Sequence, residues 1–156
     1  MTSQKHYLDN GWGALNGALI FCPSQELLPI TRDQLIEASR TRWPDRNDPG
    51  ASDNPNTKQP PGVSIDVHPE NQYPFVLDLH NGGLLISMDG LPEQNVETAA
   101  WIRSLMPEDA PRMVVGDGGF STHAELPFGV TPEQIASTMV DHGVEGWNDD
   151  DPDLQW

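Results

Sequence analysis

The stretch Pro74–Pro107, PFVLDLHNGGLLISMDGLPEQNVETAAWIRSLMP, predicts a β-hairpin followed by an amphipathic helix. Asn81-Gly82 suits a two-residue type I′ turn, because both central residues of that turn take positive φ. A turn at this point places Leu77 opposite Ile86, and apolar side chains then share one face of the hairpin. The side chains expected on that face are Phe75, Leu77, Leu79, Leu84, Ile86 and Met88.

The second half of this stretch carries the signals of a helix. Pro92 fits the first turn, Glu93 favours the positive end of the helix dipole, and Pro107 stops the helix. Apolar residues recur between them at near-helical spacing, namely Val96, Ala99, Ile102 and Met106. We expect this helix to pack on the apolar face of the hairpin.

Further strands are expected on both sides of the hairpin. Ala14–Cys22 is apolar on both faces, which is typical of an inner strand, and Val63–Val67 alternates like a half-buried strand. Arg112–Leu126 predicts a second hairpin with Asp117-Gly118 as its turn residues, which would place Val115 opposite Phe120.

Two more helices are expected to begin at capping boxes. Thr31 with Gln34, and Thr131 with Gln134, have the spacing at which the threonine hydroxyl and the glutamine side chain satisfy each other's backbone N–H groups. The later helix should run to Gly143, with Ile135 and Met139 facing inward. 

These elements predict an α+β fold with one mostly antiparallel sheet of about five to six strands and helices covering one face. We expect a single domain over residues 1–143, a long flexible loop at 45–62 and an acidic, tryptophan-containing tail at 144–156. The open face of the sheet should carry polar groups among a few apolar ones. They are Ser64, Asp66, Asp78, His80, Ser121, His123 and Glu125, with Val76, Leu85 and Val114.

The chain is strongly acidic, with 24 Asp and Glu against 8 Lys and Arg and a net charge of −16. Nucleic acids and anionic membranes would repel it, so neither is expected as a partner. The N-terminus lacks a secretion signal, no apolar run approaches the roughly 20 residues that span a bilayer, and Cys22 is the single cysteine. These features favour a cytoplasmic location.

No motif specifies a reaction. His123-Ala124-Glu125 has the H-x-E spacing of zinc deaminases, but the P-C-x-x-C element of those sites is absent. The spacing of His68, Glu70, His80 and His123 does not require a metal site. We therefore predict no catalytic residue, no metal ligand and no cofactor.

The tail VEGWNDDDPDLQW holds five acids and two tryptophans. Acidic runs are usually solvated, whereas tryptophans are rarely left in water, so the tryptophans should pack either on this protein or on a partner. The expected partner-binding residues are Trp147, Asp149, Asp150, Asp151, Asp153 and Trp156.

The chain resembles the small acidic immunity proteins that actinobacteria and other bacteria encode beside polymorphic toxins. The resemblance rests on size, acidity, the α+β order, the two hairpins and the segment GVTPEQIASTMVDHG. It implies a non-enzymatic protein that binds a cognate toxin with a basic cleft and occludes the toxin's active site. Two alternatives stay open: a homodimeric secretion-chaperone or scaffold-like protein that uses the open sheet face, and a small enzyme.

Overall fold

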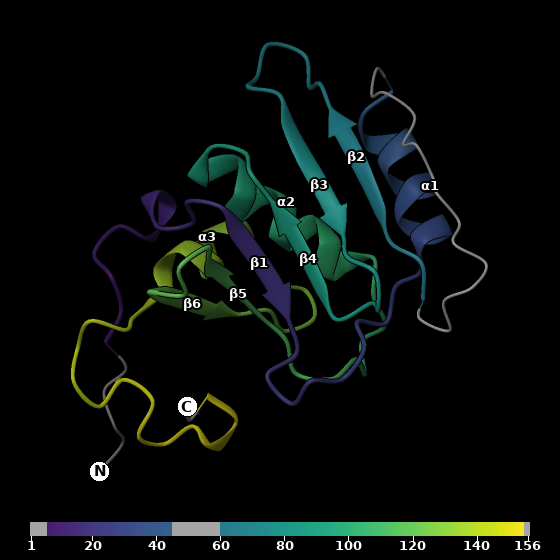
Figure 1. Cartoon of the computed structure of the whole chain (residues 1–156). Helices are drawn as coiled ribbons and strands as arrows, with labels where there is room; N and C mark the ends of the chain where they lie inside the picture. Colours follow the sequence, from purple (N-terminus) through teal and green to yellow (C-terminus); the bar gives the residue numbers. More distant parts are fainter. Residues whose placement is uncertain (1–5, 45–59, 155–156) are drawn as a thin grey trace.

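One sheet organises the protein, and helices pack on one of its faces (Figure 1). The structure, a computed structural model, describes residues 6–44 and 60–154. Its strands are β1 (Ala18–Phe21), β2 (Val63–Val67), β3 (Phe75–Leu79), β4 (Leu85–Met88), β5 (Val114–Asp117), β6 (Thr122–Glu125) and β7 (Val140–Asp141). Its helices are η1 (Gly11–Gly13), α1 (Arg32–Arg42), α2 (Pro92–Ser104), α3 (Pro132–Ser137) and η2 (Pro152–Leu154).

The strand order is β2-β3-β4-β1-β5-β6-β7, and neighbouring strands pair antiparallel throughout. The predicted α+β fold with an antiparallel sheet is therefore confirmed. The sheet has seven strands rather than five to six, because residues 140–141 form β7 beside β6 instead of prolonging the third helix. As expected for its apolar sequence, β1 is an inner strand.

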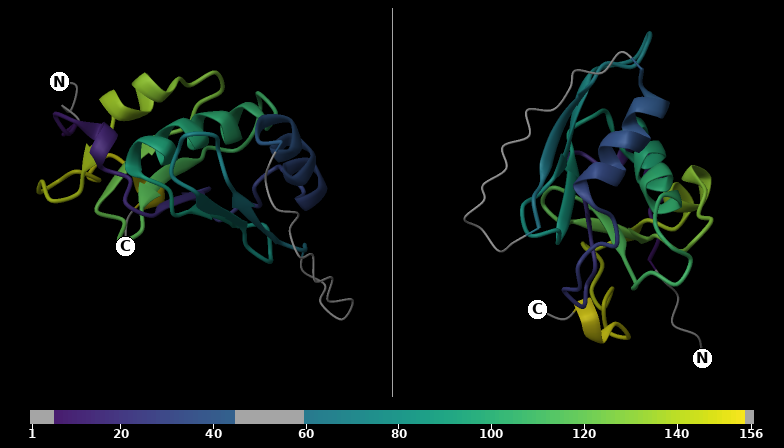
Figure 2. Two further views of the ribbon diagram at one scale, coloured as in Figure 1. Left: turned by 90° about the horizontal axis from the view of Figure 1, so that it is seen from above. Right: turned by 90° about the vertical axis from the view of Figure 1, so that its right-hand side faces the viewer.

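The helices α2 and α3 lie together on one face of the sheet, and α1 lies next to β2 (Figure 2). Trp43, which follows α1, contacts Phe75 of β3 and Trp101 of α2, with ring centroids 5.7 and 4.9 Å apart. These contacts join α1 to the core. Both predicted capping boxes form, at Thr31 with Gln34 and at Thr131 with Gln134. 

The first hairpin has the predicted strands but a different register. Leu77 pairs with Met88 and Leu79 with Ile86, two positions away from the predicted pairing. The loop is longer than a two-residue turn, since the His80 N–H donates to the Leu85 carbonyl and both Gly82 and Gly83 take positive φ. A shift of two keeps each side chain on its face. The exception is Leu84, which belongs to the loop and is exposed rather than in the core.

The second hairpin departs further from its prediction. Val115 pairs with Ala124 instead of facing Phe120. The Asp117 carboxylate accepts hydrogen bonds from the backbone N–H groups of Ser121 and Thr122, at 2.7 and 2.9 Å, and this stabilises a longer loop. Phe120 takes a positive φ in that loop, and its ring lies on the open face instead of in the core.

The third helix is shorter than predicted and ends at Ser137 instead of Gly143. Met139 is nonetheless fully buried, as expected. The N-terminal residues join the sheet edge here, because Tyr7 bridges to Val140 and the Leu8 N–H donates to the Met139 carbonyl. Among the described residues, no helix combines the length and apolar character that crossing a bilayer requires.

Replacing Gly116 by alanine is expected to lower the free energy of unfolding by about 1–3 kcal/mol, as overpacking does. The added Cβ would lie 2.6 Å from the Phe120 ring and 2.9 Å from the Thr122 carbonyl. Urea denaturation measures the effect. The control is Gly13→Ala, whose Cβ would meet nothing within 4 Å. Equal stability of the two variants would mean that Phe120 does not pack on β5.

Candidate functional site

The C-terminal segment (residues 144–154) contacts the open face of the sheet beside β6 (Figure 1). Of the predicted partner-binding residues, Trp147 and Asp151 are partly buried against the body of the protein. Asp149, Asp150 and Asp153 are exposed, and Trp156 lies outside the described residues. In the structure, Trp147 and Asp151 of the predicted set pack on the body of the protein, and the three aspartates that remain are exposed, although Asp153 also accepts a hydrogen bond from Arg112 at 3.5 Å. The boundary between residues 143 and 144 stays a prediction.

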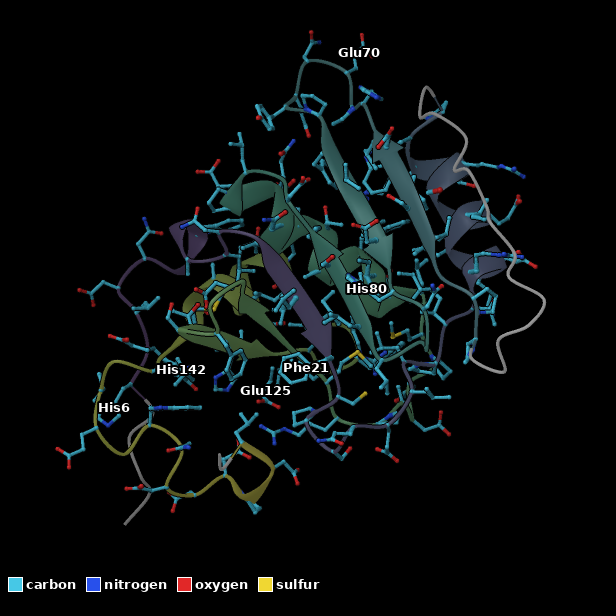
Figure 3. The ribbon with its side chains drawn as sticks, in the orientation of Figure 1. His6, Phe21, Glu70, His80, Glu125 and His142 are labelled. Atoms are coloured by element: carbon cyan, nitrogen blue, oxygen red, sulfur yellow. The ribbon has the colours of Figure 1, made fainter. Side chains whose placement is uncertain are left out.

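Trp147 is held by stacking on a histidine that the sequence analysis did not identify. Its ring lies 3.6 Å from that of His142, centroid to centroid, with an angle of 12° between the planes. His123 and Phe120 complete the aromatic cluster, at 5.6 and 6.4 Å from Trp147. In Figure 3, His142 and Glu125 lie close together at one end of the sheet, far from Glu70.

The histidine pair, His123 and His142, forms a hydrogen-bonded chain with a defined tautomer. His142 Nδ1 lies 2.6 Å from the Phe120 carbonyl oxygen, which can only accept, so Nδ1 carries the proton. The Nε2 atom of neutral His142 therefore accepts from His123 Nδ1, 2.6 Å away. His123 Nε2 is left with a lone pair, 3.7 Å from a Glu125 carboxylate oxygen.

Both histidines are neutral at pH 7. The pKa of His123 is lowered to about 4, mainly by burial and also by the charges of His142 and Arg112, against the opposing effects of Glu125 and Asp151. Burial also lowers the pKa of His142, although the hydrogen bond to Phe120 opposes that shift. A neutral pair is what the hydrogen-bonded chain requires, since each ring then donates once.

Arg112 clamps the C-terminal segment to β6. Its Nε and Nη2 donate to the two oxygens of Glu125, both at 2.7 Å, while Nη1 and Nη2 donate to Asp151 at 2.9 and 2.6 Å. These bonds raise the pKa of Arg112 and lower that of Asp151. Bidentate bonds of this kind fix geometry better than a single ion pair.

Three potential metal-ligating side chains also meet here. Donor atoms of His123, Glu125 and Asp151 lie within 4.8 Å of one another. The Arg112 guanidinium, however, already bonds both oxygens of each carboxylate and provides their counter-charge. We therefore interpret the grouping as a structural ion-pair cluster, in which the Arg112 guanidinium takes the place that a metal ion would otherwise have.

A pocket of about 290 Å³ opens beside His123 and Glu125. Its other lining residues are Tyr7, Pro127, Val130, Gln134, Thr138 and Val140. The Thr138 hydroxyl donates to the Gln134 carbonyl, so it is engaged at the end of α3 and is not activated by His123. Among the described lining residues, the arrangement offers one neutral base without a nucleophile bonded to it.

Sequence reasoning singled out Trp147 and Asp151 as partner-binding residues, which stays a prediction, and missed the side chains that they contact within this protein. His142 was assigned to a helix end, Arg112 was assigned no role beyond starting a hairpin, and Phe120 was placed in the core. The sequence did contain one signal of this site: His123 and Glu125 lie on one strand face, and an isolated arginine, Arg112, precedes the neighbouring strand. Only the packing of the tail on the sheet brings these groups together.

Comparison with known proteins identifies no relative: no family model, no curated protein and no solved structure matches this chain. The function is therefore inferred from the site itself.

Replacing Arg112 by methionine is expected to loosen the C-terminal segment and to lower the free energy of unfolding by about 1–3 kcal/mol, because two carboxylates lose their counter-charge. Urea denaturation of Arg112→Met, Asp151→Asn and the double variant gives the coupling between the two side chains. We expect a coupling of about 1 kcal/mol. Additive effects would contradict the clamp.

Proposed function

We propose that this protein is a non-enzymatic inhibitor that binds a basic protein partner, a cognate toxin domain, and covers its active site. One observation carries the proposal: the C-terminal segment is anchored to the sheet and presents carboxylates to solvent in an ordered arrangement. Its exposed acids are Glu145, Asp149, Asp150 and Asp153. 

The main anchors of this segment are side chains other than the exposed acids, although Asp153 also accepts a long hydrogen bond of 3.5 Å from Arg112 Nη1. Trp147 stacks on His142, Asp151 bonds Arg112, and Leu154 is fully buried. The Asn148 side chain also donates to the Leu154 carbonyl at 2.7 Å. Because the anchors hold the backbone, the exposed carboxylates need little further ordering on binding, which lowers the entropic cost of association.

The distribution of basic groups supports the same conclusion. The arginines of the described residues lie in α1 (Arg32, Arg40 and Arg42), in the core (Arg103) or in the clamp (Arg112). Of the arginines that the structure describes, only Arg112 lies beside the C-terminal segment, and its donors are engaged by Glu125, Asp151 and Asp153. This side of the protein is therefore an acidic surface that complements a basic cleft on the partner, and such complementarity favours fast and selective association.

The test compares two variants that each neutralise four acids. Glu145→Gln, Asp149→Asn, Asp150→Asn and Asp153→Asn together remove the exposed charges and keep Trp147, Asp151 and Leu154; the amide that replaces Asp153 retains an oxygen that can accept from Arg112. The matched control neutralises four exposed acids elsewhere, Glu70, Glu97, Glu108 and Asp109. Tagged protein is first used to isolate a stoichiometric partner from its source organism, and the affinity and activity of that partner are then measured.

We expect the segment variant to bind at least about tenfold more weakly than the control, with a shallower dependence on salt, and to relieve inhibition of the partner. Equal affinities and equal salt dependence in the two variants would exclude the segment from the interface. Isolation of the protein only as a tight homodimer would instead favour the scaffold-like alternative, in which the open sheet face is the interface.

A further inference from the structure

The part of the C-terminal segment around Trp147, which we call the Trp147 loop (residues 144–150), is held mainly by its side chains. Its backbone hydrogen bonds are local, from Val144 to Asp141, from Trp147 to Val144 and from Asp149 to Gly146. Of these bonds, only the one from Val144 reaches a strand, at Asp141 at the end of β7. Segments with such bonding open without global unfolding, so their position depends on the contacts beneath them.

We propose that mild acid opens the Trp147 loop, because the histidine pair under Trp147 accepts protons readily only after the loop has moved away. This regulation rests on the proposed function, since the loop carries acids of the proposed binding surface. The loop is closed at neutral pH and the exposed carboxylates are held in place; under acid they lose that arrangement.

The hydrogen-bonded chain explains why the closed loop resists protonation. The four ring nitrogens of the pair include one donor to Phe120, one donor and one acceptor in the bond between the rings, and the lone pair of His123 Nε2. A proton on His142 Nε2 keeps the bond between the rings only if His123 Nδ1 gives up its own proton, so the proton that the pair gains stands on His123 Nε2 in either case. A proton on His123 Nε2 places a charge on a side chain that is about 6% exposed.

Titratable or charged side chains from every neighbouring element face the histidine pair. Around His123 they are Glu125 on β6, Arg112 before β5, Asp151 in the C-terminal segment, and Tyr7, which lines the adjoining pocket. Around His142 they are Asp117 on β5 and Asp141 on β7. The carboxylates favour protonation and Arg112 disfavours it, but burial is the largest effect on the pKa of both histidines.

The direction of the linkage follows from the burial. In the open loop the histidines are hydrated and titrate near their ordinary pKa of about 6.5, whereas the closed loop holds that of His123 at about 4. The open state therefore binds more protons between these values, and acid favours it. From pH 8 to pH 5, His123 alone shifts the equilibrium toward the open loop about thirtyfold. The Arg112–Asp151 bond persists at pH 5, because Arg112 lowers the pKa of Asp151.

Hydrogen exchange of the full chain, followed by mass spectrometry and corrected for the intrinsic effect of pH, tests the proposal. We expect the protection of residues 144–150 to fall about thirtyfold from pH 8 to pH 5, while residues 75–79 of β3 and 85–88 of β4 keep theirs. Attraction between a protonated His142 and the Trp147 ring is the competing effect. A loop that stays equally protected at both pH values would show that this attraction prevails and would overturn the proposal.

Two variants make the test specific. His123→Gln with His142→Gln keeps amide donors and acceptors in place of the titrating rings and should abolish the pH response. Trp147→Ala should leave the loop open at both pH values. This variant replaces the double variant in the test if the double variant does not fold. A wild-type response retained in either variant would refute the role of the histidine pair. No partner is present in these measurements, so their failure is distinct from a failure of the proposed function.

Discussion

Replacing Arg103 by methionine is expected to lower the free energy of unfolding by about 3–5 kcal/mol, a large fraction of the stability of a domain of this size. Arg103 lies in α2 and is 3% exposed. Its Nε donates to the Leu126 carbonyl at 2.9 Å, and its Nη atoms donate to carbonyls that follow α2, namely those of Met106, Pro107 and Glu108. Methionine fills much of the space but leaves these acceptors without their donor.

The Arg103 prediction is checked by urea denaturation, with Arg40→Met as the control. Arg40 lies in α1 with its side chain 52% exposed, so its loss should change stability by no more than about 0.5 kcal/mol. Arg103→Lys should be intermediate, because an ammonium keeps the charge but cannot reach all these carbonyls at once. If Arg103→Met were as stable as the control, the guanidinium would not be a structural centre of the fold.

The second large effect is expected at Asn95. This side chain is fully buried in α2, and its amide nitrogen donates to the carbonyls of Leu15 and Gly90 at 2.8 and 3.0 Å. Asn95→Asp preserves the shape but replaces the donor with an acceptor and buries a charge. We expect a loss of about 3–5 kcal/mol at pH 7, because an uncompensated buried charge is strongly destabilising.

The pH dependence distinguishes the charge from the lost hydrogen bonds. Burial raises the pKa of an introduced carboxyl group, so the deficit of Asn95→Asp relative to the wild type should shrink as the pH falls toward 4. The neutral variant Asn95→Ala should instead show a deficit of about 2–3 kcal/mol that is independent of pH. Denaturation curves at pH 7 and pH 4.5 give both values. Parallel deficits for the two variants would contradict the burial of charge.

The sequence predicted those parts of the fold that depend on local signals. The capping boxes at Thr31 and Thr131, and the alternation of Val63–Val67, act within a few residues, and the structure contains the elements they predict. The hairpin registers depended on more distant contacts. In the first hairpin the Gly82 N–H donates to the Pro60 carbonyl, and in the second the Asp117 carboxylate organises the loop.

The site was less predictable for the same reason. Trp147 and Asp151 were singled out as partner-binding residues because tryptophans and acids are conspicuous in a short tail. Their partners, His142 and Arg112, are ordinary residues until the tail packs on the sheet and brings the stacking and the bidentate bonds together. Such contacts between distant segments leave no spacing signal in a single sequence.

The place of β1 in the sheet also has a consequence for how the chain reaches its fold. Ile20 pairs with Ile86 on one side and with Val115 on the other, 66 and 95 positions further along. The strands β2-β3-β4 and β5-β6-β7 are each built from neighbouring segments, and β1 alone joins them. During synthesis this strand leaves the ribosome first, yet it has both partners only when residue 117 has emerged. We therefore expect the two halves to form early and the insertion of β1 to limit the folding rate, as pairings between distant segments do.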